Sequence, residues 1–135
     1  MSADLRAAIE TLLVTWARCI DGGRAVEAID LYAEDAQQTM PHGTAVGREA
    51  IRAGLQRRQA LVARTSRHLV GNLVLQPGGD AQQLQGWWTM TVFRSDTQDR
   101  PAVIQLVADV EDTYRHVDGR WLIARRTVTP IFGSP

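Results

Sequence analysis

The sequence predicts an α+β domain in which helices come first and a strongly curved antiparallel sheet follows. Apolar residues recur at helical spacing in the first half of the chain, whereas from Arg67 onward they alternate as in strands. The dipeptide Asp118-Gly119 separates two strand-like runs, which is typical of a two-residue hairpin turn. Helices followed by a series of strands favour helices packed on one face of an antiparallel sheet.

Three helices are expected in the first half. Residues 3–20 form the first, which Ser2 or Asp4 can cap and Gly22-Gly23 can end. Its apolar stripe consists of Leu5, Ile9, Leu12, Leu13, Trp16 and Ile20. A short second helix would bury Val26, Ile29 and Tyr32. The third would run from Gly47 to about Val62 and carry Ile51, Leu55 and Val62 on its apolar side.

Four strands are expected in the second half. They cover residues 67–75, 82–94, 102–117 and 120–130. Turn-forming residues separate them, at Pro77-Gly78-Gly79, in the polar stretch Ser95 to Pro101, and at Asp118-Gly119. An additional first strand at Ala36 to Met40 is a further alternative.

The hairpin turn also predicts a register for the last two strands. If Val117 opposes Arg120, then Asp112 opposes Arg125 and Glu111 opposes Arg126. Opposite charges across strands contribute about 0.2–1 kcal/mol each, so we expect these pairs to hold the register. The apolar side chains expected to face the helices are Ile104, Leu106, Ala108 and Val110, together with Trp88, Met90 and Val92 of the preceding strand.

Length and composition fit one domain over residues 1–135. Of the 135 residues, 44% are hydrophobic, which is enough for a core. The chain has 15 Lys+Arg and 15 Asp+Glu, giving a formal net charge of +0. Nucleic-acid-binding proteins normally carry a basic surface, so we expect no nucleic-acid partner.

Cysteine content and the N-terminal segment indicate a cytoplasmic protein. Cys19 is the only cysteine, so no intrachain disulfide can form, and a reducing compartment is the simplest expectation. The N-terminal segment carries Asp4, Arg6 and Glu10, and its apolar run Leu12 to Val14 is short. Neither a secretory signal nor a membrane span is expected there.

Asp21 and His68 are the candidate acid–base pair. Asp21 ends the first predicted helix, where the helix dipole disfavours a carboxylate. It is either an exposed turn residue or an inward carboxylate with a hydrogen-bonding partner. His68 shares a predicted strand face with Val70, Asn72 and Val74, so it is either a satisfied core histidine or that partner. An aspartate that orients an imidazole creates a general base.

Other kinds of site lack a sequence pattern. The chain contains no His-x-His, His-Glu-x-x-His or cysteine pair, so we expect no metal site. No glycine-rich loop joins a strand to a helix, and Gly-x-Ser-x-Gly is absent. We therefore expect no cofactor.

Five short segments give the chain a family resemblance over nearly its whole length. In order, they are Trp16-Ala-Arg-Cys-Ile-Asp21, Leu31-Tyr-Ala-Glu-Asp-Ala36, Gly47-Arg-Glu-Ala-Ile51, Ser66-Arg-His-Leu-Val-Gly-Asn72 and Asp118-Gly-Arg-Trp121. Together they resemble the SnoaL-like branch of the nuclear transport factor 2-like superfamily. The resemblance implies a cystatin-like cone, in which a curved sheet wraps around the first helix and a pocket opens at one end.

Within that branch, the chain looks most like the group that contains scytalone dehydratase and hexachlorocyclohexane dehydrochlorinase. Both use an Asp–His dyad as general base, and Asp21 and His68 match those positions. The chain departs from the first in having Trp88 in place of a second histidine, and its substrate-activating tyrosines have no clear counterparts here. It departs from the second in having Trp16 in place of a lysine. Neither named activity therefore transfers directly.

These observations support two hypotheses. In the first, the protein is a cofactor-free dehydratase, isomerase or cyclase that uses Asp21 and His68 on a small apolar or aromatic molecule. The side chains expected to contact that molecule are Trp16, Trp88, Met90, Leu106 and Val110. In the second, it is a non-catalytic binding or scaffold subunit that resembles the small subunit of ring-hydroxylating dioxygenases. Either protein would be a homodimer or homotrimer.

Overall fold

The chain, described by a computed structural model over residues 1–97 and 101–133, begins with helix α1 (Ala3–Asp21). The hydroxyl of Ser2 accepts a hydrogen bond from the backbone N–H of Leu5 at 3.2 Å and so caps the helix start. The helix ends at Gly22, whose N–H donates to the carbonyl of Arg18. Residues 98–100, within the polar stretch predicted to follow a strand, lie outside the described residues.

The next helices differ in detail from the prediction. The second is a 3₁₀ helix, η1 (Ala25–Leu31), and Tyr32 begins a strand instead of lying on that helix. The third is α2 (Arg48–Ala60), which is shorter than predicted and leaves Val62 89% exposed. The helix ends two residues before Val62, so Val62 is not part of the apolar side of α2.

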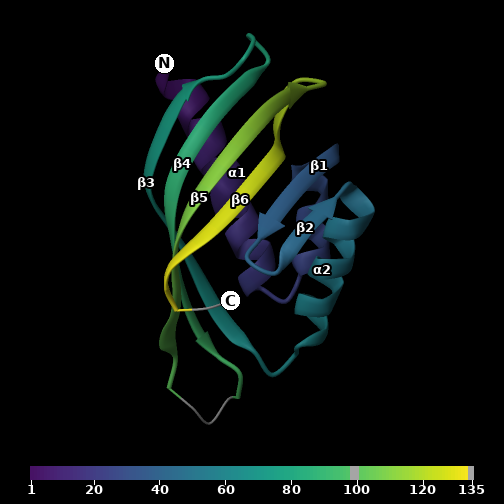
Figure 1. The fold of residues 1–135 in the computed structure, drawn as a ribbon, viewed down its shortest axis with the longest axis vertical. Coiled ribbons are helices and arrows are strands. Elements are labelled where there is room, and N and C mark those ends of the chain that lie inside the picture. The colour runs from purple at the N-terminus through teal and green to yellow at the C-terminus, as the bar shows by residue number, and fades with distance from the viewer. Residues whose placement is uncertain (98–100, 134–135) are drawn as a thin grey trace.

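In the described part of the chain, six strands form one curved, open and mostly antiparallel sheet in the order β2-β1-β6-β5-β4-β3 (Figure 1). They are β1 (Tyr32–Met40), β2 (Gly43–Val46), β3 (Thr65–Pro77), β4 (Gln83–Ser95), β5 (Val103–Val117) and β6 (Arg120–Gly133). The strand β2 was not predicted because its four residues are too few for a pattern. The predicted curved antiparallel sheet is confirmed, with one exception in its pairing: β1 and β6 run parallel.

The hairpin between β5 and β6 has the predicted turn but not the predicted charge pairs. Val117 opposes Arg120, and Asp118 and Gly119 have φ values of 50° and 84°, as a two-residue turn requires. A β-bulge then places an extra residue, Ala124, in β6. Beyond it, Asp112 opposes Arg126 rather than Arg125.

The same bulge separates the second predicted charge pair. Glu111 opposes Thr127 rather than Arg126, because the register has moved by one residue. The pairing predicted from the turn alone was therefore wrong beyond the bulge. Leu106 and Val110 of β5 are still buried, as expected for the face toward the helices.

Two further bulges change which side chains face inward. In β3 the register shifts between Gly71 and Val74, next to Asn72 with a φ of 55°. Val74 is consequently 52% exposed. The prediction that Val74 shares a strand face with His68 is therefore wrong. In β5 a bulge opposite Val92 leaves Ile104 60% exposed, although it was expected to face the helices.

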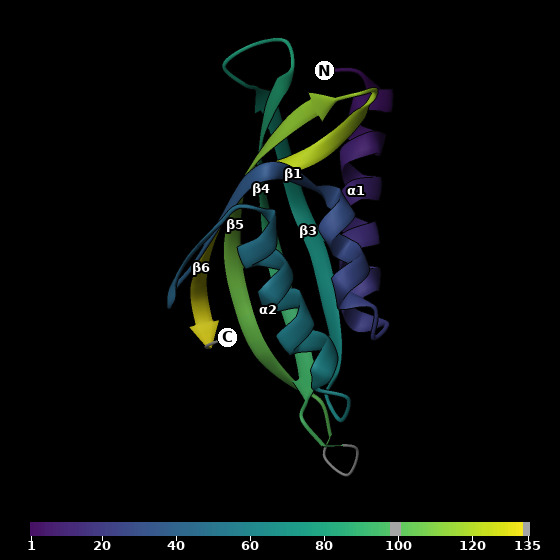
Figure 2. The same cartoon turned by 90° about the vertical axis from the view of Figure 1, so that its right-hand side faces the viewer.

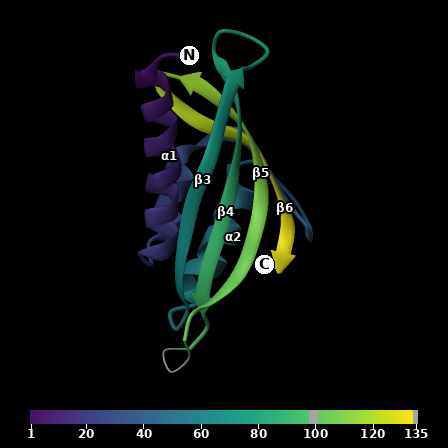
Figure 3. The same ribbon diagram turned by 90° about the vertical axis from the view of Figure 1, so that its left-hand side faces the viewer.

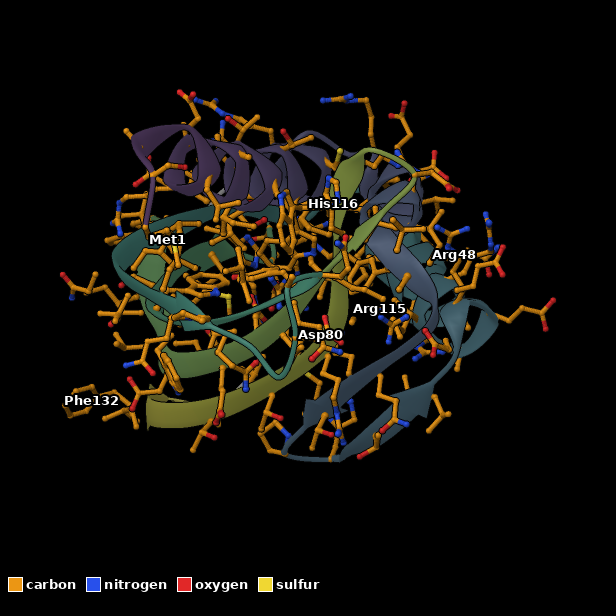
Figure 4. All side chains as sticks on the ribbon, turned by 90° about the horizontal axis from the view of Figure 1, so that it is seen from above. Met1, Arg48, Asp80, Arg115, His116 and Phe132 are labelled. Atoms are coloured by element: carbon orange, nitrogen blue, oxygen red, sulfur yellow. The ribbon has the colours of Figure 1, made fainter. Side chains whose placement is uncertain are left out.

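The core lies between the helices and the concave face of the sheet (Figure 2). Helix α1 runs along β3, so the C-terminal end of this helix meets the start of that strand (Figure 3). Side chains fill the space between α1 and the sheet when the molecule is seen from above (Figure 4). Cys19 is one of these core residues, and burial raises the pKa of its thiol.

Candidate functional site

The site is built where α1 ends and β3 begins. Asp21 is the last residue of α1, and His68 is the fourth residue of β3. Nδ1 of His68 lies 2.7 Å from Oδ1 of Asp21, and the backbone N–H of His68 donates to Oδ2 of the same carboxylate, also at 2.7 Å. The two residues thus contact each other through both a ring nitrogen and a backbone amide.

The Asp21 carboxylate accepts several hydrogen bonds from protein groups. Besides the two contacts from His68, Oδ1 accepts a hydrogen bond of 2.7 Å from the hydroxyl of Ser66. Burial opposes the charge, but the hydrogen bonds from the ring and backbone of His68 and from Ser66 outweigh it, so the pKa of Asp21 lies below its ordinary value. These contacts offset the unfavourable position at the end of a helix.

The contact with Asp21 determines the protonation pattern of His68. An ionised carboxylate can only accept hydrogen bonds, so Nδ1 of His68 must donate to it. In the neutral imidazole, Nε2 then keeps its lone pair. The His68 side chain is 14% exposed and that of Asp21 8%, so the imidazole is the more accessible member of the pair. This arrangement can act as a general base.

Trp16 packs against the pair from within α1. Its ring lies edge-on to the imidazole of His68, with centroids 5.3 Å apart and planes at 83°. The indole Nε1 of Trp16 donates to the hydroxyl of Tyr32 at 3.0 Å, and that hydroxyl donates to Gln38 Oε1 at 2.8 Å. Trp16 therefore has a defined orientation next to His68.

A buried ion pair lies deeper in the cone. Nε and Nη2 of Arg126 donate to the two oxygens of Asp112, at 2.8 and 2.9 Å. Trp88 Nε1 and the hydroxyl of Tyr114 donate to Oδ2 of Asp112, at 2.9 and 2.7 Å. Burial and the charge of Asp112 raise the pKa of Tyr114, which keeps its phenol protonated as a donor.

Arg126 links this ion pair to the dyad through aromatic rings. Its guanidinium carbon lies 4.7 Å from the ring centroid of Trp16 and 5.3 Å from that of Trp88. Among the described residues, its Nη1 has no hydrogen-bond partner. Burial disfavours the charge, but Asp112 outweighs this effect and raises the pKa of Arg126. Arg126 thus stays charged beside Trp16, which in turn contacts His68.

Sequence reasoning missed this ion pair, although one signal for it was available. Asp112 and Tyr114 continue the every-second-residue pattern of Leu106 and Val110, so the alternation places all four on the inner face of β5. The partner could not be identified in the same way, because the bulge in β6 moves Arg126 into the position expected for Arg125.

All five side chains proposed to contact a substrate are buried. They are 8% or less exposed and belong to one apolar core: Trp16, Trp88, Met90, Leu106 and Val110. A surface cavity of about 420 Å³ touches Trp88 and Val110, but otherwise lies among Asn72, Trp87, Thr89, Asp109, Glu111, Thr127 and Thr129. It includes neither member of the dyad. Substrate contact by the five side chains therefore stays a prediction.

A second cavity, of about 480 Å³, lies near the hairpin. Its walls come from β1, α2 and the β5–β6 turn, and include Glu34, Asp35, Arg48, Arg115 and Arg120. Asp35 and Arg115, which both line it, form an ion pair of 2.7 Å. The labelled Arg48 and Arg115 lie on the side of the molecule that carries β1 and β2 (Figure 4). This cavity does not include Asp21 or His68 either.

Within the described part of the chain, no three His, Cys, Asp or Glu side chains come together in a way that could hold a metal ion. No helix in residues 1–97 and 101–133 has both the length and the apolar character needed to cross a membrane.

The fold and the site together define a small α+β domain with a carboxylate–imidazole pair at one end of its cone. The chain belongs to the SnoaL-like domain family, whose model matches residues 1–127. No curated protein is significantly similar to it in sequence.

Solved structures share the fold at low sequence identity. A Novosphingobium aromaticivorans protein provisionally named scytalone dehydratase has a TM-score of 0.83 and 23% identity, covering 94% of this chain and 84% of that one. ActVI-ORFA from Streptomyces coelicolor has a TM-score of 0.83 and 20% identity, covering 96% and 98%. A Catenulispora acidiphila protein in complex with S-DNPA has a TM-score of 0.82 and 23% identity, covering 96% and 95%.

Proposed function

We propose that the chain is a cofactor-independent acid–base enzyme in which His68, oriented by Asp21, removes a proton from a small apolar or aromatic molecule. The observation that carries this proposal is the 2.7 Å contact between Nδ1 of His68 and Asp21, combined with an imidazole that is still 14% exposed. The contact leaves Nε2 as the nitrogen that can accept a proton.

The reaction class follows from what one base can do. Nε2 of His68 would take a proton from carbon, and the electron pair of that C–H bond would pass into an adjacent carbonyl or expel a leaving group. Dehydration, isomerisation and cyclisation all begin with this step. The names of the similar structures support the proposal, because one is provisionally called a scytalone dehydratase and another was solved with the ligand S-DNPA.

The substrate would approach an apolar and aromatic surface. The ring of Trp16 packs against both His68 and Trp88. The guanidinium of Arg126 lies over the same Trp16 ring. We propose that Trp16, Trp88, Met90, Leu106 and Val110 form the part of the core that a small molecule would contact on entering. Because these side chains are buried, entry requires them to move apart.

Hydrogen–deuterium exchange tests the base directly. A panel of small aromatic ketones with enolisable C–H bonds is incubated with the protein in D₂O, and the loss of each α-proton signal is followed by ¹H NMR. Replacing His68 by Gln should slow any protein-dependent exchange by about 10²–10⁴-fold. The control is His116→Gln, since His116 lies near the hairpin and contacts Gln82 and Trp121 instead. Exchange that survives in His68→Gln would exclude His68 as the base.

A second candidate function is favoured by the packing of the interior. Trp16, Trp88 and Arg126 contact one another beside the dyad, and the two cavities described above lie elsewhere. A non-catalytic binding or scaffold subunit would have such a filled cone. This alternative would be supported if the protein exchanged the α-protons of none of the ketones and copurified with a large iron–sulfur subunit.

We further propose that the chain acts in the cytoplasm as a homodimer or homotrimer. Exposed apolar side chains on three strands support the assembly: Leu69 of β3 is 53% exposed, Trp87 of β4 36% and Ile131 of β6 50%. Light scattering on the purified protein would measure the mass of the particle. A mass equal to that of a single chain at micromolar concentration would contradict this proposal.

A further inference from the structure

Ser66 lies between helix α2 and the dyad and is 2% exposed. Its hydroxyl has two contacts. It accepts a hydrogen bond of 2.8 Å from Nη2 of Arg58, on α2, and it lies 2.7 Å from Oδ1 of Asp21. Ser66 therefore joins the α2 arginine to the carboxylate that orients His68.

The direction of this hydrogen-bond chain follows from the groups at its ends. A guanidinium can only donate, so Arg58 occupies a lone pair of the Ser66 oxygen and the hydroxyl proton of Ser66 is directed to Asp21. The backbone N–H of His68, which points to Oδ2, can also only donate. Both carboxylate oxygens thus receive donors of fixed direction, which is the pattern of an ionised carboxylate. Nδ1 of His68 must then donate as well.

The charges around Asp21 explain why such a chain is needed. When His68 is the neutral base, no cation within residues 1–97 and 101–133 is in direct contact with the Asp21 carboxylate, whose side chain is 8% exposed. Arg58 interacts with it electrostatically and reaches it through one hydroxyl. Among the described residues, Arg64, Arg94 and Asp96 also act electrostatically on Arg58.

Those other groups are already paired with one another. Oδ1 of Asp96 lies 2.8 Å from Nε of Arg64 and 3.0 Å from Nε of Arg94. Asp96 therefore balances two arginines that do not contact Ser66 in any described interaction. Arg58 is the arginine that donates to the Ser66 hydroxyl, whereas Nη1 of Arg67 donates to the Ser66 backbone carbonyl at 2.6 Å.

We propose that Ser66 is a positioning residue for the Asp21–His68 pair. Its hydroxyl, directed by Arg58, holds the carboxylate of Asp21 ionised and in the orientation that keeps the proton of neutral His68 on Nδ1 and leaves Nε2 free. The biological purpose of this arrangement rests on the proposed function, but the arrangement itself is defined without any substrate. Ser66 does not touch the reacting atoms and is not a catalytic residue.

NMR of the imidazole nitrogens tests this role. In ¹⁵N-labelled protein, at a pH where His68 is neutral, long-range ¹H–¹⁵N correlations should show Nδ1 protonated and Nε2 unprotonated. Ser66→Ala should convert this single tautomer into a mixture, which moves the two nitrogen shifts toward each other. The ¹³C titration midpoint of the Asp21 carboxyl should rise toward its ordinary value, because one of its donors is lost.

Two further variants separate the hydroxyl from its arginine. Arg58→Gln should move the His68 nitrogen shifts and the Asp21 midpoint in the same directions as Ser66→Ala. The matched control is Arg57→Gln, which removes a charge from the neighbouring, exposed position of the same helix and should change neither. Backbone amide spectra of each variant check that the fold is retained, and Arg58, half-buried at the helix surface, provides the test even if Ser66→Ala fails to fold.

The outcomes are separate from those of the exchange assay. If folded Ser66→Ala or folded Arg58→Gln keeps the single His68 tautomer and the low Asp21 midpoint, the positioning role is overturned, whatever activity the protein has. Equal effects of Arg57→Gln and Arg58→Gln would also overturn it, because they would reflect general charge and not the hydrogen-bond chain. A shifted tautomer in a protein that exchanges no ketone would retain Ser66 as a positioning residue and reject the proposed enzyme.

Discussion

Arg126 and Asp112 form a two-point ion pair across adjacent strands, with the Nε to Oδ1 distance at 2.8 Å and side chains only 2% and 0% exposed. Trp88 and Tyr114 donate the further hydrogen bonds that the carboxylate requires. The Trp16 ring contacts both the guanidinium of Arg126 and the imidazole of His68. A charged group is thus held close to the dyad without bonding to it.

Removing the charge of Asp112 should destabilise the protein strongly. Asp112→Asn leaves the buried guanidinium of Arg126 without a compensating charge, so the free energy of unfolding should fall by about 3–5 kcal/mol. Urea denaturation followed by tryptophan fluorescence would measure it. The double variant Asp112→Leu/Arg126→Met should be more stable than the single one, because it removes both charges together.

An exposed ion pair provides the comparison. Arg115 and Asp35 are also 2.7 Å apart, but their side chains are 35% and 72% exposed. Asp35→Asn should therefore change the free energy of unfolding by less than about 1 kcal/mol. Equal losses from Asp35→Asn and Asp112→Asn would show that burial does not govern the strength of the inner pair.

The contribution of Asp21 to stability should depend on pH. Its folded-state pKa is lowered, so in acid the unfolded chain takes up this proton before the folded chain does. Relative to Asp21→Asn, the wild type should be more stable by about 1–3 kcal/mol at neutral pH. This difference should be fully present above the unfolded pKa of about 3.9 and be lost as the pH falls through the lower, folded-state pKa.

Paired urea titrations of the two proteins between neutral pH and pH 3 would measure that difference. Other carboxylates titrate in both proteins, so their effects largely cancel in the comparison. A difference that stays constant, or grows as the solution becomes more acidic, would mean that the Asp21 carboxylate is not stabilised in its ionised form.

Tyr32→Phe should reveal how Trp16 is held beside His68. The Tyr32 hydroxyl accepts from Trp16 Nε1 at 3.0 Å and donates to Gln38 at 2.8 Å. Its removal leaves the buried indole N–H without its acceptor, so the free energy of unfolding should fall by about 1–3 kcal/mol. Differential scanning calorimetry would measure the loss.

Thr39→Val serves as the matched control for Tyr32→Phe. Thr39 shares a surface hydrogen bond of 3.0 Å with Thr44, where water can replace the lost partner, so the change should stay within about 0.5 kcal/mol. If Trp16→Phe/Tyr32→Phe loses as much as the two single variants added together, the indole and phenol are not coupled.

The overall fold and the dyad could be predicted from sequence because their signals are local or match a family pattern. The apolar spacing of α1 and the Asp118-Gly119 turn each depend on a few neighbouring residues. The family resemblance supplied what local signals lack, namely that the end of α1 meets the start of β3. The 2.7 Å contact between Asp21 and His68 has this geometry. Its catalytic use stays a prediction.

The surroundings of the dyad were decided only by the tertiary structure. Bulges at Ala124 and near Asn72 each add one residue to a strand. Because side chains alternate between the two faces of a sheet, one added residue reverses the face expected for every later side chain in that strand. This is why Arg126 and not Arg125 pairs with Asp112, and why Val74 faces away from His68. A β-bulge depends on how a strand pairs with its neighbour, so the residue pattern of one strand alone does not predict it.

The sequence by itself determined which residues prefer helix, strand and turn, since these preferences arise from the spacing of apolar side chains and from backbone geometry at glycine. Only the tertiary structure decided which polar groups meet inside the cone. Ser66 lies on β3 and Arg58 on α2, and a short loop joins these two elements. Arg58 donates to Ser66, and Ser66 in turn donates to Asp21, which lies on a third element, α1. Burial makes each of these groups require a partner, and the path of the whole chain determines which partner is within reach.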